Sequence, residues 1–171
     1  VSAKEYLAKN DRKAAVIQIK NALQSNPNLP EARFLLGSTL LESGDPVGAE
    51  TELRKALDLK YPQTAVIPPL AQSMLAQGQA KKVIAEFGGT ELGAPQAKAN
   101  LQMTLASAYA MQGKPDLSVT ALNAALTAAP GYAPALVAKA GEKASHGDFD
   151  GALAILDDVI AKTPQSAEAW K

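Results

Sequence analysis

The feature that most constrains the fold of this chain is a short turn that recurs at a fixed interval. Pairs of turn-forming residues follow one another 34, 34, 35 and 34 residues apart, at Asn10-Asp11, Gly44-Asp45, Gly78-Gln79, Gly113-Lys114 and Gly147-Asp148. A second mark lies 17 residues after each turn, at Pro27, Tyr61, Pro95, Pro130 and Pro164. A period of this length indicates a repeat protein. Two marks in each period predict two helices in each repeat.

The residues at these marks explain how the helices would end and begin. Glycine tolerates the left-handed conformation that ends a helix. Asp45 and Asp148 can then cap the next helix, and Pro46 and Pro115 suit its first turn, where no N–H is needed. Each turn is therefore predicted to join two helices in a hairpin.

Composition and periodicity both indicate an all-α chain. Ala fills 34 positions and Leu 21, whereas Val, Ile and Thr together fill only 22 of 171. Ala and Leu are strong helix formers, and β-branched residues favour strands. Small and apolar residues also recur three and four positions apart, which places them on one helix face. These core positions are Ala15, Ile19, Ala22, Leu23, Leu36, Gly37, Leu40, Ala49, Leu53, Ala56, Leu57, Leu105, Ala106, Tyr109, Leu122, Ala125, Leu126, Ala140, Ala152, Leu156, Val159 and Ile160. Where two helices of a hairpin cross, we expect Gly37 to face Ala49.

The pattern resembles the tetratricopeptide repeat (TPR). Leu36-Gly37, Ala49 and Ala56 match that motif, as do Ala15, Ala22 and Pro27, then Ala152 and Pro164, while Trp170 would open a sixth repeat. The resemblance implies an all-α fold, a right-handed TPR α-solenoid of about five helix–turn–helix repeats. We predict a single array over residues 1–171, with repeats at about 1–29 (partial), 30–63, 64–97 (irregular), 98–132 and 133–166, and the start of a sixth at 167–171.

The third repeat departs from the pattern. Its first helix is expected to begin at Pro68 or just before, because two prolines stand together there. Its second helix, about Ala80 to Phe87, stops early at Gly88-Gly89, and residues 88–94 read as a loop before a helix of about Pro95 to Gln112. The loop is interpreted either as a degenerate connection that bends the stack or as a binding loop or hinge.

The two ends are also irregular. Val1 enters in the middle of a first helix, and Lys171 follows Trp170 in an opening turn. A solenoid repeat buries one face on its neighbour, so end repeats need a polar cap. We therefore expect repeats to continue on both sides, and self-association through the exposed ends that buries Trp170 or the Tyr6 face.

Little in the sequence supports catalysis. The chain has no Cys and a single His, His146, whose place at a helix end suits a dipole contact. Asp157-Asp158 are adjacent on a helix and do not face each other, and no acidic or histidine set has metal-ligand spacing. We predict a non-enzyme with no cofactor and no metal. Lys+Arg and Asp+Glu balance at 17 each, and no run of 18 apolar residues occurs, so neither nucleic acid nor a membrane span is expected.

The TPR resemblance implies that first helices line a concave groove for a protein or peptide. The corresponding positions are Glu31, Phe34, Ser38, Leu41, Gln72, Leu75, Asn100, Met103, Ser107, Met111, Val137 and Ser145. Some arrays of this family hold a terminal carboxylate with paired Lys and Asn. Those places carry Phe34, Ser38, Pro68 and Gln72 here, so no binding of acidic chaperone tails is expected.

Longer segments narrow the resemblance further. They include Tyr6-Leu-Ala-Lys-Asn-Asp, Glu31-Ala-Arg-Phe-Leu-Leu-Gly and Gln77-Gly-Gln-Ala-Lys-Lys-Val-Ile. Together they resemble the TPR lipoproteins of the PEP-CTERM/exosortase system, which are encoded with exopolysaccharide and protein-sorting machinery. The resemblance implies a scaffold in the bacterial envelope, periplasmic or tethered to the outer membrane, with the lipid-bearing Cys upstream of Val1. The alternatives are a cytosolic (cytoplasmic) adaptor or co-chaperone module, and an assembly segment of a larger enzyme.

Overall fold

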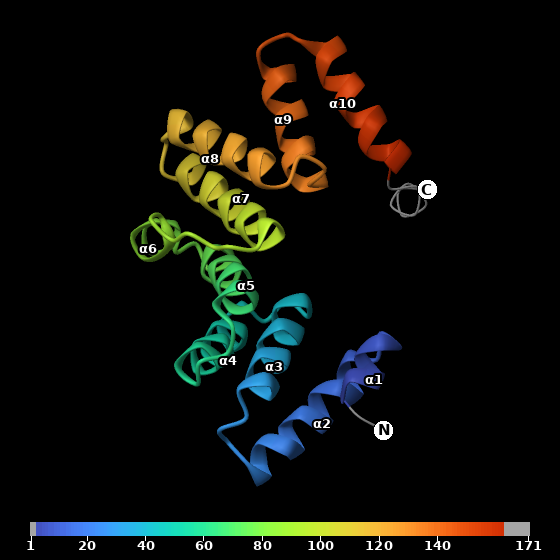
Figure 1. Cartoon of the computed structure of the whole chain (residues 1–171), viewed down its shortest axis with the longest axis vertical. Helices are drawn as coiled ribbons and strands as arrows, with labels where there is room; N and C mark the ends of the chain where they lie inside the picture. The colour runs from blue at the N-terminus through green and yellow to red at the C-terminus, as the bar shows by residue number, and fades with distance from the viewer. Residues whose placement is uncertain (1–2, 163–171) are drawn as a thin grey trace. The chain divides into compact units, whose positions relative to one another are not determined.

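The computed structural model describes residues 3–162, and these residues form ten α-helices and no strand. The all-α prediction is therefore confirmed. The chain divides into two compact units, residues 1–93 and residues 94–171. Figure 1 labels the helices of both units in chain order.

The first unit holds six helices. They are α1 (Ala3–Ala8), α2 (Arg12–Ser25), α3 (Pro30–Glu42), α4 (Pro46–Asp58), α5 (Gln63–Ala76) and α6 (Ala80–Phe87). Each packs on the next along the chain, and α3 also contacts α5. Ile19, Leu23 and Leu36 form one buried cluster between α2 and α3. A first helix in this unit therefore touches both its hairpin partner and the next first helix.

The second unit holds four helices in two hairpins. They are α7 (Pro95–Met111), α8 (Pro115–Ala128), α9 (Ala133–Ser145) and α10 (Phe149–Lys162). The helices α7 and α8 pack together, as do α9 and α10, and α9 contacts both α7 and α8. The core is made largely of alanine, with Ala99, Ala108, Ala125 and Ala135 fully buried. Small side chains let these helices approach closely.

The predicted turns are present where the period placed them. Backbone φ is positive at Gly44, Gly78, Gly113 and Gly147, and the first turn has Asn10 in the same conformation. The Asp45 carboxylate accepts a hydrogen bond from the Gly48 N–H at 2.9 Å. Asp148 caps α10 in the same way, through Gly151 N–H at 2.9 Å. The prediction of glycine stops and aspartate caps is confirmed.

The close crossing of α3 and α4 differs in detail from the prediction. A Cβ added to Gly37 would lie 2.6 Å from Leu53 Cγ and 3.1 Å from the Leu53 backbone nitrogen. Gly37 therefore faces Leu53 rather than Ala49, one helical turn further along α4. Ala49 is nevertheless fully buried. The small residue is required, but its partner is a large side chain.

The start of α5 was predicted wrongly. The helix begins at Gln63, and Pro68 and Pro69 lie inside it. An interior proline removes a backbone hydrogen bond and costs about 3 kcal/mol in an isolated helix. Here the surrounding residues Val66, Leu70 and Met74 are fully buried, because α5 packs between α4 and α6. Burial on two sides outweighs the local preference against proline.

Other predicted core positions also need correction. Ala22 is exposed, and Ile160 is 54% exposed on α10. The loop at 88–94 and the short helix α6 are confirmed, and α7 ends at Met111, one residue before the expected Gln112. Pro164 and Trp170 lie outside the described residues. The single array and its repeat boundaries stay predictions.

Candidate functional site

The twelve predicted groove residues lie on the first helices of their hairpins, and none of them is buried. Glu31, Phe34, Ser38 and Leu41 lie on α3, with Gln72 and Leu75 on α5. Asn100, Met103, Ser107 and Met111 lie on α7, with Val137 and Ser145 on α9. The structure thus places six of them in each unit. The helices α3 and α5 contact each other, as do α7 and α9, so the six residues of each unit lie on neighbouring helices.

In the first unit, several of these side chains are already engaged. Glu31 pairs with Lys4 at 2.7 Å. The Phe34 ring stacks on Tyr61 with centroids 4.9 Å apart. Ser38 borders a small cavity of about 240 Å³ next to the Arg12–Glu42 ion pair. These residues have less free surface than their helical spacing predicted.

In the second unit, a larger cleft of about 520 Å³ lies between α7, the start of α8 and the end of α9. Pockets of roughly 300–1,000 Å³ are the usual size for small ligands and side-chain anchors. Three predicted residues, Met103, Ser107 and Ser145, line it. Asn100, Met111 and Val137 do not, although Met111 is 56% and Val137 50% exposed.

The floor of this cleft is apolar. It consists of Met103, Ala106, Ala110, Val119, Leu122 and Ala138. Of these, Ala106 and Leu122 are buried, whereas Met103, Val119 and Ala138 are half-buried. Methionine adapts its shape to different apolar partners. The floor can accept an apolar group. Of these residues, the sequence predicted only Met103 for the groove and placed Ala106 and Leu122 in the core.

The rim of the cleft is polar and sits at the end of α9. The Ser145 hydroxyl donates to the Glu142 backbone carbonyl at 2.6 Å. His146 Nδ1 lies 2.8 Å from the same oxygen. A carbonyl oxygen only accepts, so Nδ1 donates this hydrogen bond. The prediction that His146 serves a helix end is confirmed, although it also borders the cleft.

Glu142 is the charged group of the rim. Its Oε2 accepts from Lys139 Nζ at 2.6 Å, and the two side chains are only 23% and 27% exposed. The second carboxylate oxygen, Oε1, has no hydrogen bond in this pair. Glu142 was not among the predicted residues. Its position four residues before His146, on the face toward the cleft, could have indicated it.

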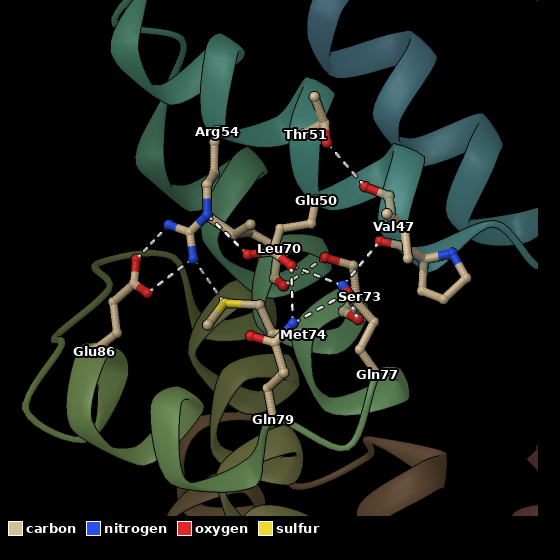
Figure 2. A network of polar contacts seen from close by, with 11 residues as sticks. Val47, Glu50, Thr51, Arg54, Leu70, Ser73, Met74, Gln77, Gln79 and Glu86 are labelled. Atoms are coloured by element: carbon tan, nitrogen blue, oxygen red, sulfur yellow. Dashed lines mark hydrogen bonds and ion pairs between the residues drawn. The ribbon is translucent and has the colours of Figure 1, made fainter.

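A polar network missed by the sequence analysis joins α4, α5 and α6 in the first unit (Figure 2). Arg54 holds Glu86 at 2.9 and 3.1 Å and Glu50 at 2.9 Å. The Gln77 amide donates to Glu50 Oε2 at 2.7 Å and to the Pro46 carbonyl at 3.2 Å. The pKa of Arg54 is raised, first by its hydrogen bond with Glu86. Burial raises the pKa of Glu50, but hydrogen bonds from Arg54 and Gln77 outweigh it, and the pKa is lowered overall.

The rest of the described chain offers no metal site and no membrane span. Among residues 3–162, no group of three or more acidic or histidine side chains could hold a metal ion. None of the helices in that range combines the length and apolar character needed to cross a bilayer. Asp157 and Asp158 are both exposed.

Comparison with known protein families identifies the family of this chain. Two models described as "Tetratricopeptide repeat" match it, one over residues 2–63 and the other over residues 109–171. The chain is therefore a tetratricopeptide-repeat protein, which confirms the broader of the two resemblances. No curated protein matches it.

Solved structures support the same fold. A thermophilic TPR protein of Thermus thermophilus is 21% identical, with a TM-score of 0.76 over 97% of this chain and 90% of that one. MamA is 21% identical, with a TM-score of 0.66 over 97% and 96%. YrrB, a TPR protein with an unusual peptide-binding site, is 19% identical, with a TM-score of 0.58 over 95% and 83%. At these identities the likeness extends to the fold alone, and the TPR solenoid class is confirmed.

Proposed function

We propose that this chain is a non-catalytic scaffold that binds a protein or peptide on its first helices. The TPR fold is typically an interaction scaffold. The observation that carries the proposal is the open cleft between α7, α8 and α9, with its apolar floor and polar rim. Three of the residues predicted for peptide binding border it. YrrB provides a TPR precedent with a peptide-binding site.

Site-specific crosslinking in native cells tests this proposal. A photoreactive residue replaces Ser107, which borders the cleft, and in a control it replaces Thr120, an exposed residue of α8 outside it. We expect the Ser107 probe to capture one defined partner. Equal capture by both probes, or by neither, would argue against binding at the cleft.

We further propose that the chain belongs to a bacterial envelope lipoprotein linked to exopolysaccharide production and PEP-CTERM sorting. The segments around Tyr6, Glu31 and Gln77 support this by resemblance. Fractionation of native cells, combined with mass spectrometry of the intact N-terminus, tests it. A lipid-modified protein in the outer-membrane or periplasmic fraction is expected. An unmodified protein in the cytoplasm favours an adaptor, and a catalytic domain on the same polypeptide favours an enzyme assembly segment.

The end helices support a proposal of self-association. On α10, Phe149 is 64%, Leu153 58% and Ile160 54% exposed. On α1, Tyr6 is half-buried, while Trp170 lies outside the described residues. We expect the chain to associate at high concentration, and Leu153→Glu to weaken the association. Sedimentation over a concentration series tests this, and a monomer throughout would contradict it.

A further inference from the structure

The cleft in the second unit has a closed counterpart in the first. Aligning the turn glycines, Gly44 with Gly113 and Gly78 with Gly147, places α3–α5 on α7–α9. In the first unit, the Gln77 amide bridges from the end of α5 to α4. It donates to Glu50 Oε2 at 2.7 Å and to the Pro46 carbonyl at 3.2 Å, and to the Ser73 carbonyl of its own helix at 3.1 Å (Figure 2).

The second unit lacks this bridge because its residues differ at both ends of it. His146 stands at the position of Gln77, and its Nδ1 keeps only the bond to the carbonyl four residues earlier, Glu142. Val119 stands at the position of Glu50 and has no side-chain acceptor. The space that the Gln77–Glu50 bridge spans in the first unit is part of the open cleft in the second.

The helix α9 is also less tightly packed than α5 at the corresponding positions. The α5 residues Leu70 and Met74 are fully buried. Their counterparts on α9 are Lys139 and Lys143, which turn to the acidic partners Glu142 and Asp148. Long cationic side chains keep their charged ends in contact with water. The corresponding face of α9 therefore carries charged side chains in place of buried apolar ones, although neither lysine lines the cleft itself.

The open cleft calls for a particular ligand chemistry. Its floor is apolar, and among the described residues that line the cleft Glu142 alone carries a full charge; its ion pair with Lys139 uses Oε2 and leaves Oε1 for another donor. Charge-assisted hydrogen bonds to a carboxylate are the stronger kind. An apolar group next to a cationic N–H donor matches both parts of the site.

We propose that the α7–α8–α9 cleft is a docking site for a basic peptide, one large apolar side chain of which enters the cleft while a neighbouring arginine or lysine binds Glu142. The proposal rests on the scaffold function and deepens it by naming the partner's chemistry. It also assigns Glu142 and Val119 to the site, neither of which lies in the predicted groove set.

The three methionines provide a direct test in the full chain. Met103 lines the cleft, Met111 is exposed on the same helix, and Met74 is buried at the closed junction. With methyl-labelled methionine, NMR is used to titrate the blocked peptide Ala-Leu-Ala-Arg-Ala and two matched peptides, with Ser for Leu or Glu for Arg. We expect saturable movement of the Met103 signal with the first peptide, at least about fivefold weaker binding of each matched peptide, and no movement of Met74.

Variants separate the cleft from the fold. Val119→Glu with His146→Gln restores the pair that closes the first unit, and should weaken the peptide at least about tenfold. Leu117→Glu, on the same helix but outside the cleft, is the matched control and should bind normally. Glu142→Gln should abolish the preference for Arg over Glu in the peptide, whereas Asp157→Asn, an exposed charge on α10, should not.

The outcomes are distinct. If the double variant loses helicity, Ala110→Leu replaces it, since Ala110 is exposed and its counterpart is Leu41. Loss of binding with helicity retained supports the proposal. The proposal is overturned if the Met103 methyl signal does not move, or if the folded cleft variants bind the peptide with unchanged affinity. If other signals move but the Met103 signal does not, the peptide binds elsewhere and the proposed site is wrong. The scaffold function would still stand, because crosslinking tests it separately.

Discussion

Two junctions of the same kind, α4–α5 in the first unit and α8–α9 in the second, have opposite character. At the first, Leu70 and Met74 are fully buried and the Gln77 bridge joins the helices. At the second, two lysines and a histidine occupy these positions, and a cleft of about 520 Å³ remains. The hairpin fold accepts both because each hairpin buries its own interface.

The difference shows where a repeat protein can change function without losing its fold. The interface inside a hairpin is held by small buried residues such as Gly37, Ala49 and Ala56 in the first unit and Ala106 and Ala125 in the second. The interface between successive hairpins tolerates a switch from apolar to charged residues. The contacts that close the α4–α5 junction stabilise it, whereas the open α8–α9 junction leaves a surface that a ligand can reach. Four predictions test this contrast, from the largest effect to the smallest.

The largest effect is expected from exchanging the packing residues. Leu70→Lys places an ammonium in a fully buried position, with an expected cost of about 3–5 kcal/mol because a buried charge without a partner is strongly destabilising. The reciprocal Lys139→Leu leaves the half-buried Glu142 without its partner and should cost less, about 1–2 kcal/mol, because solvent still reaches that carboxylate. Hydrogen exchange resolved by peptide measures both, and equal effects would refute the contrast.

The hairpin interface should respond less strongly to overpacking. Ala49 is fully buried, so Ala49→Leu should cost about 1–3 kcal/mol and lower the Tm. Its counterpart Ser118 borders the cleft, so Ser118→Leu has room to enter and should cost less. Thermal unfolding followed by circular dichroism gives both values. An unchanged Tm for Ala49→Leu would contradict the packing assignment.

Sequence reasoning succeeded where the physics is local. Turn glycines, aspartate caps and helical spacing depend on a few neighbouring residues, and they placed most helix ends correctly. It failed at Pro68 and Pro69, where burial of α5 from both sides overrides proline's local cost. It also paired Gly37 with the wrong residue of α4, because spacing alone does not give the crossing point.

For the site, helical spacing identified Met103, Ser107 and Ser145 but missed Glu142, Val119 and His146 as neighbours of the cleft. Which spacing-equivalent surface is open depends on how tightly two hairpins pack, and that is a property of both. One signal was present in the aligned repeats. Lys139 and Lys143 stand where Leu70 and Met74 stand, and such a change marks a helix face that is not buried by apolar packing.

The hydrogen-bond bridge should matter at only one of the two junctions. Gln77→Ala removes a donor to Pro46 and to Glu50, and we expect a loss of about 1–2 kcal/mol because both half-buried acceptors lose a hydrogen bond, although Glu50 keeps those from Gln79 and Arg54. His146 is exposed, so His146→Ala should change stability by less than about 0.5 kcal/mol. Urea unfolding of the two variants compares them. A larger loss for His146→Ala would show that the bridge does not hold the first junction.

The smallest expected effect is a difference in acid sensitivity between the junctions. Burial raises the pKa of Glu50, but hydrogen bonds from Arg54 and Gln77 outweigh it and leave the pKa lowered. A carboxyl group with a lowered folded pKa contributes stability above its unfolded pKa, about 4.3 for glutamate, and loses it as the pH falls through the folded value. The α4–α5 junction should therefore weaken below about pH 4.3. The α8–α9 junction has Val119 in place of Glu50, and valine has no group to protonate. The Met74 and Met103 methyl signals report the two junctions separately, so between about pH 5 and pH 3 Met74 should change more than Met103. Glu50→Gln removes the titrating group and should reduce this difference, and a Met74 transition unaffected by that substitution would assign the acid response to another carboxylate.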